Sequence, residues 1–489
     1  WTNGLNINSS QRHVYYSFYD PVSGTFPIPG GSVNVVPSAK SGFNCIDVVS
    51  SGQAVVCMHA QVTGAPDYQT IVAKDYFARV GAFDPRSITA TAGHDTLIWP
   101  HMAVDINDNI YVFAREMGSG AAHSLVHHSF SDDAGNSFDQ YQFADSISVP
   151  SFTVATSRIS EKAAYGYHQF LGSYEDPGLW TGFLALQLNN DAMVVIKDNA
   201  AEEWDFDNPI NITNIITAEP DFLPDTIQAQ GDTLRAYLDI DLMYDNADVL
   251  HAMFTTRGLY EAPWDSGAPP ISGLTEASLI WHWRADTYEL DVVAWGWWNC
   301  TDSTHAGDAG AWKSTICRPS MGIDDMGNIY CAFERYEDVE VNPDVSLGGF
   351  GNGEIYVTVS TDGGRNWAEA TNITNTHSNG AAAGACYSEC FPSLAEEVDE
   401  YLHIFYTEDK DAGSYVFETS TLSTENPMWY ERLLASEIPT TPLVEQIEFH
   451  VRPVGVEEVP KISPSELLGF PPPIIKRKPL SDSKWQLLS

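Results

Sequence analysis

Two aspartates in one apolar stretch have the types and the spacing that acid–base chemistry on a glycosidic bond requires. Asp239 and Asp241 stand two residues apart in the sequence Leu-Asp-Ile-Asp-Leu. Because the side chains of a β-strand alternate between its faces, both carboxylates would lie on the same face. Glycoside hydrolysis uses two carboxylates roughly 5 to 10 Å apart, one of them with a raised pKa. These aspartates are the best local pair for that chemistry.

An acidic residue recurs at the same place in other predicted strands, which favours a structural role instead. Asp105 and Asp324 each follow an apolar run and begin an Asn-containing turn. Asp side chains cap such turns by accepting backbone N–H groups. Asp105, Asn107 and Asn109 also alternate as calcium ligands do, but the bidentate Glu and the Gly of a calcium loop are absent. Turn capping without a cofactor is therefore predicted, with calcium as the alternative.

Histidine and tryptophan also gather locally. His123, His127 and His128 could bind zinc, but no fourth ligand accompanies them, so they are predicted to be outer-strand residues. The sequences Trp-His-Trp at 281–283 and Trp-Gly-Trp-Trp at 295–298 could stack on sugar rings. Large aromatic side chains are more often buried, so both groups are predicted to pack in the core.

The charge of the chain excludes several classes of partner. Its 489 residues include 24 basic and 66 acidic ones, for a net charge of −42. A field of this sign repels nucleic acid and anionic membrane surfaces. No apolar run reaches the roughly 18 residues that suggest a membrane span, so no membrane insertion is expected. The expected partners are cations, neutral glycans and basic surfaces, and a glycan or cell-surface partner is among them.

Seven cysteines fit an oxidising compartment. The candidate disulfide pairs are Cys45 with Cys57, Cys300 with Cys317, and Cys386 with Cys390. The first pair flanks a Ser-Ser-Gly turn symmetrically, which would place the two residues opposite each other in a hairpin. Up to three disulfides in an extracellular or cell-surface protein are predicted, with Cys331 left as a buried thiol. The alternative is that all seven cysteines stay reduced.

A repeated hairpin module accounts for most of the chain. In residues 318–374, apolar runs alternate with turns rich in Asp, Gly and Asn, which predicts two consecutive β-hairpins. Inner hairpins of this kind recur six times and outer hairpins seven times. The inner ones start at intervals of about 50 to 85 residues, which fits a four-stranded blade with variable loops. Four of them open on an X-Pro-X step, and Pro suits the first residue of a strand.

The turns at residues 131–138 and 360–367 carry one motif. It resembles the Asp box, S-x-D-x-G-x-x-W, of sialidase-type β-propellers. The two copies are formed by Ser131, Asp133, Gly135 and Phe138 and by Ser360, Asp362, Gly364 and Trp367. The resemblance implies a structural role in which the Asp accepts backbone N–H groups across the turn and the Gly adopts a conformation denied to other residues. The aromatic side chain would fill the gap between adjacent blades.

The modules and the motif together predict an all-β protein, a β-propeller of four-stranded antiparallel blades, with seven blades favoured and six as the alternative. A seventh blade would combine residues 14–26 with residues 444–454. Both chain termini would then close the propeller and remove exposed strand edges. The propeller is predicted to span residues 1–455.

Residues 456–489 form a segment of different composition. It holds three consecutive prolines and five of the 24 basic residues. It resembles the linker of secreted bacterial proteins that are sorted by type IX secretion. Composition alone favours disorder, so an ordered tail would have to dock, either on its own blades or on a second copy through strand addition. Self-association through this tail is the favoured prediction.

The resemblance to sialidases also implies a possible active site. A sialidase uses a cluster of three arginines, a Tyr–Glu nucleophile pair and an Asp acid/base. Residues of suitable type are Arg318, Glu334, Arg335, Tyr336, Glu337 and Tyr387. The early F/Y-R-I-P motif of the family is missing, and a fold does not fix a function. A secreted or cell-surface propeller with a binding or self-assembly role is therefore predicted, with catalysis left open but not favoured; the alternative is an extracellular glycoside hydrolase of the sialidase type.

Overall fold

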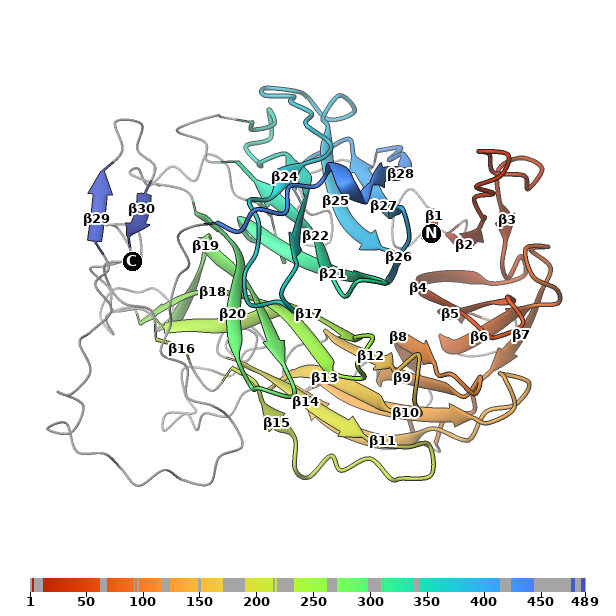
Figure 1. The fold of residues 1–489 in the computed structure, drawn as a ribbon. Coiled ribbons are helices and arrows are strands. Elements are labelled where there is room, and N and C mark those ends of the chain that lie inside the picture. Colours follow the sequence, from red (N-terminus) through yellow and green to blue (C-terminus); the bar gives the residue numbers. More distant parts are fainter. Residues whose placement is uncertain are drawn as a thin grey trace, which may run out of the picture. The chain divides into compact units, whose positions relative to one another are not determined.

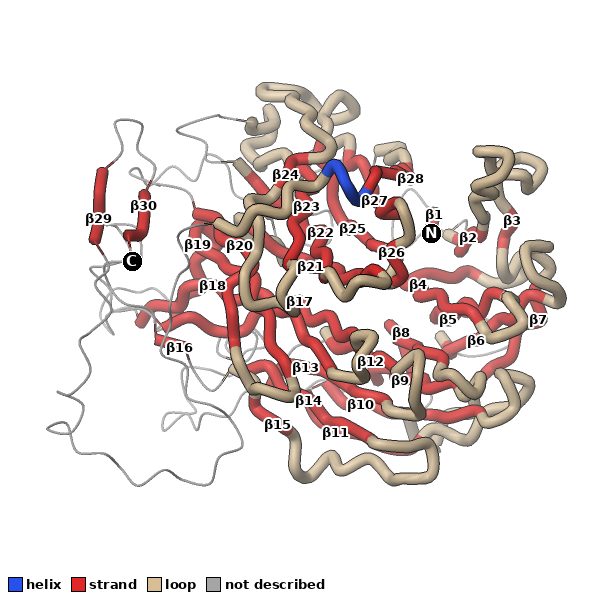
Figure 2. Tube along the Cα trace, in the orientation of Figure 1, coloured by secondary structure: helices blue, strands red, loops and turns tan. Residues whose placement is uncertain are grey.

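The structure is a computed structural model of the chain. The residues that it describes are 2–3, 12–61, 68–91, 93–94, 96–116, 124–147, 151–169, 190–213, 216–217, 233–261, 271–297, 309–310, 312–337, 344–413, 424–443, 476–479 and 485–488. Strands make up almost all of the regular structure in these residues (Figure 2). The one helical element that they contain is a single 3-10 turn, η2 (Ala435–Glu437).

Six sheets have the antiparallel meander of propeller blades (Figure 1). Three of them consist of β4 (Lys40–Val48), β5 (Ala54–Gln61), β6 (Gln69–Asp75) and β7 (Phe83–Ser87); β8 (Leu97–Val104), β9 (Ile110–Glu116), β10 (Ser124–Ser131) and β11 (Gln142–Ile147); and β12 (Phe152–Thr156), β13 (Ala163–Gln169), β14 (Asp191–Lys197) and β15 (Ile210–Asn211).

The other three blades vary in strand number. They consist of β16 (Ile216–Thr217), β17 (Thr233–Tyr244), β18 (Leu250–Glu261), β19 (Ile271–Arg284) and β20 (Leu290–Trp297); β21 (Ile316–Asp324), β22 (Ile329–Tyr336), β23 (Gly353–Ser360) and β24 (Thr371–Asn372), joined by β26 (Glu397–Val398); and β25 (Ser388–Leu394), β27 (Tyr401–Asp409) and β28 (Met428–Leu434). Strand β26 pairs in parallel with β21, whereas the remaining pairs in these blades are antiparallel.

The predicted fold class, an all-β β-propeller, is confirmed, with six blades where the sequence favoured seven. The chain before the first blade forms β1 (Thr2–Asn3), β2 (His13–Tyr16) and β3 (Val33–Asn34). These strands of two to four residues make a small three-stranded sheet rather than part of a blade. Residues 444–454, predicted to complete a seventh blade, lie outside the described residues, and so does the predicted closure by both termini.

In the predicted tail of residues 456–489, the structure describes two short strands. They are β29 (Lys476–Pro479) and β30 (Trp485–Leu488), which pair antiparallel with each other. The predicted docking of the tail concerns residues that are mostly outside the described part of the chain. Among the described residues, no helix is long and apolar enough to cross a membrane.

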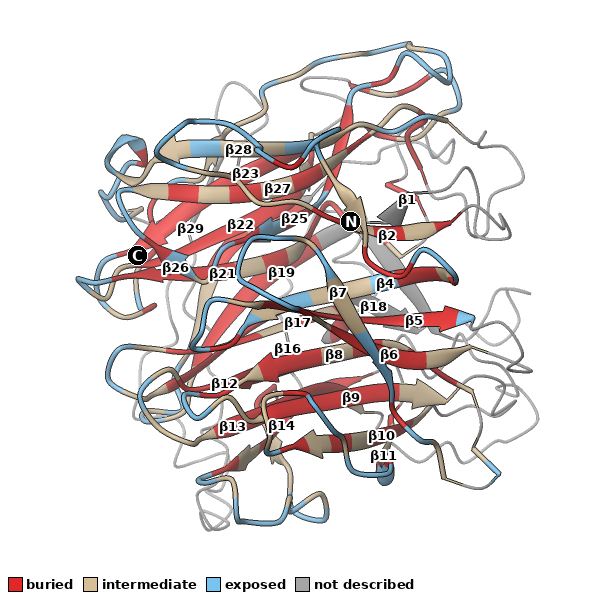
Figure 3. Ribbon diagram, turned by 90° about the vertical axis from the view of Figure 1, so that its right-hand side faces the viewer, coloured by how far each residue is buried: buried red, intermediate tan, exposed pale blue. Residues whose placement is uncertain are grey.

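The chain divides into two compact units. Unit 1 comprises residues 1–167, 194–209 and 246–248, and unit 2 comprises residues 168–193, 210–245 and 249–489. Each unit has its own apolar cores, which are the main driving force for folding. In unit 1, residues of β5, β6 and β9 such as Val55, Val72 and Val112 form one core; strands β5 and β9 are buried over most of their length (Figure 3). In unit 2, one core gathers Met253 and Phe333, among other residues.

A β-bulge interrupts the first long strand of five blades. The register of pairing shifts within β4, β8, β17, β21 and β25. The residues that occupy the left-handed conformation at these bulges, with φ of 51° to 66°, are Phe43, Trp99, Leu238, Arg318 and Phe391. This conformation costs a residue with a Cβ on the order of 1 to 2 kcal/mol. Bulges and strained residues of this kind are common next to functional sites, where they redirect side chains.

The bulges explain the X-Pro-X steps of the sequence. Pro100, Pro319 and Pro392 directly follow a left-handed bulge residue. A bulge leaves its extra residue unpaired, so the missing N–H of Pro costs no hydrogen bond of the ladder. The prediction that Pro occupies the first residue of a strand is therefore wrong for these three positions, because each lies at a bulge inside its strand.

Two hairpin turns are capped by aspartate as predicted. Oδ1 of Asp105 accepts the backbone N–H groups of Asn107 and Asn109, both at 2.9 Å. The Asn109 side chain donates to the other oxygen at 2.9 Å. The turn after Asp324 repeats this arrangement with Met326 and Asn328. Because the turn itself supplies hydrogen bonds to both oxygens, the capping role accounts for these carboxylates without calcium.

The turns at residues 131–138 and 360–367 have matching hydrogen bonds. These are Gly135 N–H to Ser131 Oγ (2.9 Å), Ser137 N–H to Asp133 Oδ1 (2.8 Å), Gly364 N–H to Ser360 Oγ (2.8 Å) and Asn366 N–H to Asp362 Oδ1 (2.9 Å). Gly364 has a φ of +93°, and a Cβ there would collide with the ring of His282. Trp367 is buried and donates its indole N–H to the Gly364 carbonyl at 2.8 Å.

The described cysteines are free thiols, which corrects the disulfide prediction. They are Cys45, Cys57, Cys317, Cys331, Cys386 and Cys390, and Cys300 lies outside the described residues. Cys45 and Cys57 do lie opposite each other in the β4–β5 hairpin, as predicted. Their sulfurs and those of Cys386 and Cys390 are nevertheless not bonded to each other; Cys45 Sγ donates toward the Pro100 carbonyl (3.7 Å) and Cys386 Sγ toward that of Ala381 (3.7 Å). Cys331 is buried as predicted.

Candidate functional site

Three strands of unit 2 bring together two carboxylates and one guanidinium. Asp239 lies on β17, Arg318 on β21 and Glu334 on β22. Arg318 Nε lies 3.2 Å from Glu334 Oε1, and Arg318 Nη1 lies 3.8 Å from Asp239 Oδ1. The backbone N–H of Arg318 donates to Asp239 Oδ2 at 2.9 Å. The guanidinium is further fixed by the Trp312 carbonyl at 3.1 Å and by the ring of Phe391, 4.4 Å away.

The two carboxylates of this cluster differ in their access to solvent. The Glu334 side chain is fully buried, whereas the side chains of Asp239 and Arg318 are 14% and 24% exposed. Glu334 Oε2 accepts the hydroxyl of Tyr336 at 3.1 Å, and its Oε1 accepts the backbone N–H of Phe391 at 2.5 Å. Glu334 therefore supports Arg318 from inside, and Asp239 is the carboxylate that a ligand could reach.

Burial and charge shift the pKa values in this cluster. Burial raises the pKa of Asp239 above its ordinary value, although Arg318 works in the opposite direction. For Arg318, burial lowers the pKa, but the carboxylates of Asp239 and Glu334 outweigh it and raise the pKa above the ordinary value. Burial raises the pKa of Tyr336 well above its ordinary value. Tyr336 therefore stays protonated and is a poor nucleophile, whereas Asp239 is suited to proton transfer.

The predicted pair Asp239 and Asp241 shares one face of β17. Asp241 is half-buried, and its Oδ2 accepts the backbone N–H of Met321 at 2.8 Å, so both aspartates reach the same strand, β21. Burial raises the pKa of Asp241 to about 7. Two residues along a strand span about 6.6 Å. The backbone spacing of the pair is therefore of the same order as the roughly 6.5 to 9.5 Å between the carboxyl groups of inverting glycoside hydrolases.

Arg257 adds a second guanidinium that the sequence did not point to. It lies on β18, and its guanidinium carbon is 3.6 Å from the centre of the Tyr237 ring. Tyr237 precedes Asp239 by two residues, and both Arg257 and Arg318 lower its pKa against the larger effect of burial. This contact depends on the pairing of β17 with β18. Nothing in the spacing of residues 237 and 257 could have indicated it.

The remaining residues of the predicted sialidase set lie elsewhere. Arg335 Nε is 3.9 Å from Glu337 Oε1, and its guanidinium lies 5.1 Å from the Tyr356 ring. Alternation along β22 turns Arg335 away from the face that Glu334 and Tyr336 share. Tyr387 is exposed, with the Lys410 ammonium 4.1 Å from its ring centre. The predicted set is therefore divided, and Arg318, Glu334 and Tyr336 form one part of it.

A second group of carboxylates with raised pKa values lies on β23 and β25. Burial, followed by the charges of Glu389 and Glu337, raises the pKa of Glu354 to about 8. Burial raises the pKa of Glu389 to about 7, although Thr376 donates a hydrogen bond to it at 2.7 Å. The Asn372 side chain donates to Glu354. These carboxyl groups change protonation near neutral pH and should affect stability there.

Aromatic rings and arginine side chains adjoin each other at the two bulges of unit 1. The rings of Phe43 and Trp99 are 5.6 Å apart, and Phe43 is 48% exposed. The guanidinium of Arg115 lies 4.7 Å from the Trp99 ring, and that of Arg12 lies 5.6 Å from the Phe43 ring. Arg12 also contacts His59 at 2.9 Å. Flat aromatic faces beside polar groups are suited to sugar rings.

The histidine and tryptophan clusters of the sequence have different outcomes. His123 lies outside the described residues. His128 stacks on Phe113, with ring centres 5.7 Å apart, and His127 contacts Glu116, so these histidines do not act together. Trp281 and Trp283 are almost completely buried, as predicted for core residues. In the second cluster, Trp295 is half-buried, and the side chains at 297 and 298 lie outside the described residues.

Comparison with known proteins gives similarity of fold. No protein-family model matches the chain, and no curated protein matches it significantly. Among solved structures, it resembles the GH93 α-L-arabinofuranosidase of Fusarium graminearum in complex with arabinobiose, at 10% identity and a TM-score of 0.42, over 82% of this chain and 96% of that one. It also resembles a PL25 ulvan lyase, at 12% identity and a TM-score of 0.44, over 83% of each chain. A Hadza microbial sialidase has 13% identity and a TM-score of 0.38, over 82% of this chain and 66% of that one.

These neighbours correct the functional prediction. The sequence favoured a binding or self-assembly role, with a glycoside hydrolase as the alternative. The three neighbouring structures are carbohydrate hydrolases and a lyase. They do not support the predicted binding role, and their identity and TM-scores are too low to carry a substrate or an activity over to this chain.

Proposed function

We propose that the protein is an extracellular glycoside hydrolase that inverts configuration, with Asp241 as general acid and Asp239 as general base. The observation that carries this proposal is the Asp239–Asp241 pair on one face of β17. Burial raises the pKa of both residues, and both remain partly accessible. Residues with shifted pKa values cluster at functional sites.

The different surroundings of the two aspartates support the assignment of roles. Burial places the pKa of Asp241 at about 7, so a substantial fraction is protonated at neutral pH and can donate to a leaving oxygen. Asp239 faces the Arg318 guanidinium, which favours its ionised form. An ionised Asp239 can accept a proton from water that attacks the opposite side of the sugar.

The charge of the cluster favours neutral substrates. The Arg318 guanidinium is already paired with the carboxylates of Asp239 and Glu334, which neutralise its charge. It would therefore attract an acidic sugar only weakly. The net charge of −42 also repels anionic polymers. The exposed ring of Phe43 and the half-buried ring of Trp99 support sugar binding within unit 1. A neutral glycan fits these features best.

The turns at residues 131–138 and 360–367 are further proposed to be Asp boxes of the sialidase type. Their matching hydrogen bonds support this assignment. In each turn the Asp and the Ser accept backbone N–H groups of the turn itself, so these residues serve the fold rather than the chemistry.

The proposal is tested by incubating the full chain with aryl glycosides and soluble neutral polysaccharides and by measuring released reducing ends. The anomeric form of the first product is read by NMR. Release from at least one neutral glycan with inverted configuration is expected. Absence of release across the panel would overturn the hydrolase proposal, and retained configuration would overturn the assigned roles.

A further inference from the structure

Three metal-binding side chains converge in unit 1. His94 lies in the segment between β7 and β8, Glu116 is the last residue of β9, and His127 lies on β10. His94 Nδ1 is 2.8 Å and His127 Nε2 is 3.3 Å from the same oxygen, Glu116 Oε2. The two imidazole rings lie 5.0 Å apart. Among the described residues, this is the one group of at least three His, Cys, Asp or Glu side chains whose ligand atoms all lie within 4.8 Å of one another.

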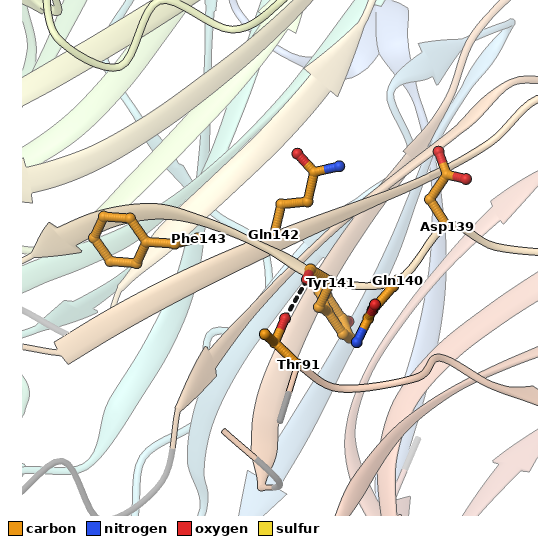
Figure 4. A pocket seen from close by; sticks show the side chains of 6 residues that line it. All are labelled: Thr91, Asp139, Gln140, Tyr141, Gln142 and Phe143. Atoms are coloured by element: carbon orange, nitrogen blue, oxygen red, sulfur yellow. Dashed lines mark hydrogen bonds between the residues drawn. The ribbon is translucent and has the colours of Figure 1, made fainter. Parts of the chain in front are cut away.

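The fold explains why these side chains meet. Strands β9 and β10 pair with Ala114 opposite His127, which places Glu116 near the His127 side chain on the adjacent strand. The segment with His94 then lies against this strand pair. Thr91, three residues before His94 in the same segment, donates a hydrogen bond to the Tyr141 carbonyl at 2.5 Å (Figure 4). This bond holds the segment beside the start of β11.

The distances suit a small divalent ion. Zinc bonds of about 2.0 to 2.1 Å in a tetrahedral site separate ligand atoms by about 3.3 Å. The present distances of 2.8 and 3.3 Å need little adjustment to reach that value. Two imidazole nitrogens and one carboxylate oxygen form a donor set for zinc and for other first-row divalent metals.

Charge and access also favour a cation. The Glu116 side chain is 14% exposed, and its ion-pair partners within the described part of the chain are these two histidines. The side chain of His94 is 38% exposed and that of His127 is 1% exposed, so one ligand is anchored and another borders solvent. A chain with a net charge of −42 concentrates cations near its surface.

We propose that His94, Glu116 and His127 bind one divalent transition-metal ion, with zinc as the expected ion and a fourth position open to water. Three protein ligands with an open position are typical of accessible zinc sites. His127 Nδ1 has no hydrogen-bond partner among the residues that the structure describes. Because a second-shell acceptor usually strengthens a zinc-bound histidine by about 10- to 100-fold, the affinity should be moderate.

An open pocket borders the proposed site. It has a volume of about 470 Å³ and is lined by Thr91 and residues 139–143 (Figure 4). Phe143 pairs with His127 across β10 and β11, and their rings are 5.9 Å apart. A ligand in this pocket would therefore lie close to the metal-binding side chains.

The test uses the full chain after removal of metal with EDTA. Zinc binding is measured by calorimetry, and cobalt is added as a spectroscopic probe of a tetrahedral site. The variants are His94→Ala and Glu116→Gln, with thermal melting in EDTA as the check that both fold. The matched control is His403→Ala, since His403 pairs with a carboxylate, Asp399, at 3.3 Å but belongs to no group of three possible metal ligands within the described residues.

One equivalent of zinc is expected to bind to the wild type and to His403→Ala. Loss of a direct ligand costs more than loss of a second-shell partner, so His94→Ala and Glu116→Gln should bind zinc more than about 100-fold more weakly. Zinc should also raise the melting temperature of the wild type and of His403→Ala, but not that of the two variants. Absence of stoichiometric binding, or binding unchanged in His94→Ala and Glu116→Gln, would overturn the proposal.

Discussion

Asp239 and Arg318 are joined through both backbone and side chain. The backbone N–H of Arg318 donates to Asp239 Oδ2 over 2.9 Å, and the Arg318 Nη1 lies 3.8 Å from Oδ1 of the same carboxylate. The two residues are 79 positions apart in the sequence. Asp239 follows the left-handed Leu238, and Arg318 is itself left-handed. Two strained bulges therefore meet at the carboxylate that the proposed reaction uses, as is common at active sites.

Removal of the Arg318 guanidinium should strongly destabilise unit 2. Arg318→Ala leaves Glu334 as a buried carboxylate without this partner, which costs about 3 to 5 kcal/mol. Urea unfolding measures the loss. The control is Arg86→Ala, because Arg86 pairs with Asp84 on the surface and should contribute only about 0 to 1 kcal/mol. Equal effects of the two substitutions would contradict the importance of the buried network.

The double variant Arg318→Ala/Glu334→Gln distinguishes two causes of the lost stability. These are the unpaired charge of Glu334 and the lost contacts of the Arg318 side chain. The double variant carries no unpaired carboxylate at this position, so it should recover part of the lost free energy of unfolding. A double variant that is less stable than Arg318→Ala would show that the charge of Glu334 is not the cause.

Stability should fall as the pH rises through neutrality. The pKa of Glu354 is raised from 4.5 to about 8 and that of Glu389 to about 7, chiefly by burial. Between the ordinary pKa of 4.5 and these raised values, the folded chain holds more protons than the unfolded chain. The free energy of unfolding therefore decreases as the pH increases across this window. Calorimetric melting across this range measures the decrease. Glu354→Gln should reduce it, whereas Glu400→Gln, at an exposed position, should not.

The Asp residues of the two similar turns should matter for stability alone. Asp133→Ala and Asp362→Ala each leave backbone N–H groups of a turn unpaired, which should lower the free energy of unfolding by about 1 to 3 kcal/mol. Turnover by the folded protein should be unchanged. Variants that melt like the wild type but lose activity would instead place these turns in the active site.

The aromatic pair of unit 1 should contribute to glycan binding. Trp99→Ala removes a ring that lies beside Phe43 and Arg115. An aromatic contact of about 0.5 to 1.5 kcal/mol corresponds to an affinity loss of about 2- to 12-fold, measured by calorimetry with the glycan found in the screen. Phe77→Ala is the control, since Phe77 is 72% exposed in a turn. An equal loss in both variants, or none in Trp99→Ala, would exclude this platform.

Features that depend on residues close together in the sequence were predicted better than features that depend on distant residues. The capping of turns by Asp105 and Asp324 follows from residues within four positions of each other, and the blade meander follows from alternating apolar runs. The blade count was overestimated because residues 14–26 have the sequence pattern of an outer hairpin, whereas the strand there is the short β2 (His13–Tyr16). The disulfide prediction was wrong because residues that face each other across a hairpin need not be bonded: Cys45 and Cys57 are paired in register and remain thiols.

The candidate sites were found only in part, since their residues come from distant strands. Asp239 and Asp241 were visible as a pair because they belong to one strand. The contact of Asp239 with Arg318 depends on the packing of β17 against β21, and that of His94 with His127 depends on the path of a loop. The bulges that redirect Asp239 and Arg318 give no distinctive sequence signal apart from a following Pro at some of them.

The most direct test of the account is the rate of glycan hydrolysis by Asp239→Asn and Asp241→Asn, with Asp399→Asn as the control at an exposed carboxylate. If the two aspartates transfer protons, kcat/KM should fall by about 100- to 10,000-fold in each variant while the melting temperature stays near that of the wild type. The control should retain full activity. Wild-type rates in Asp239→Asn and Asp241→Asn would contradict the central claim.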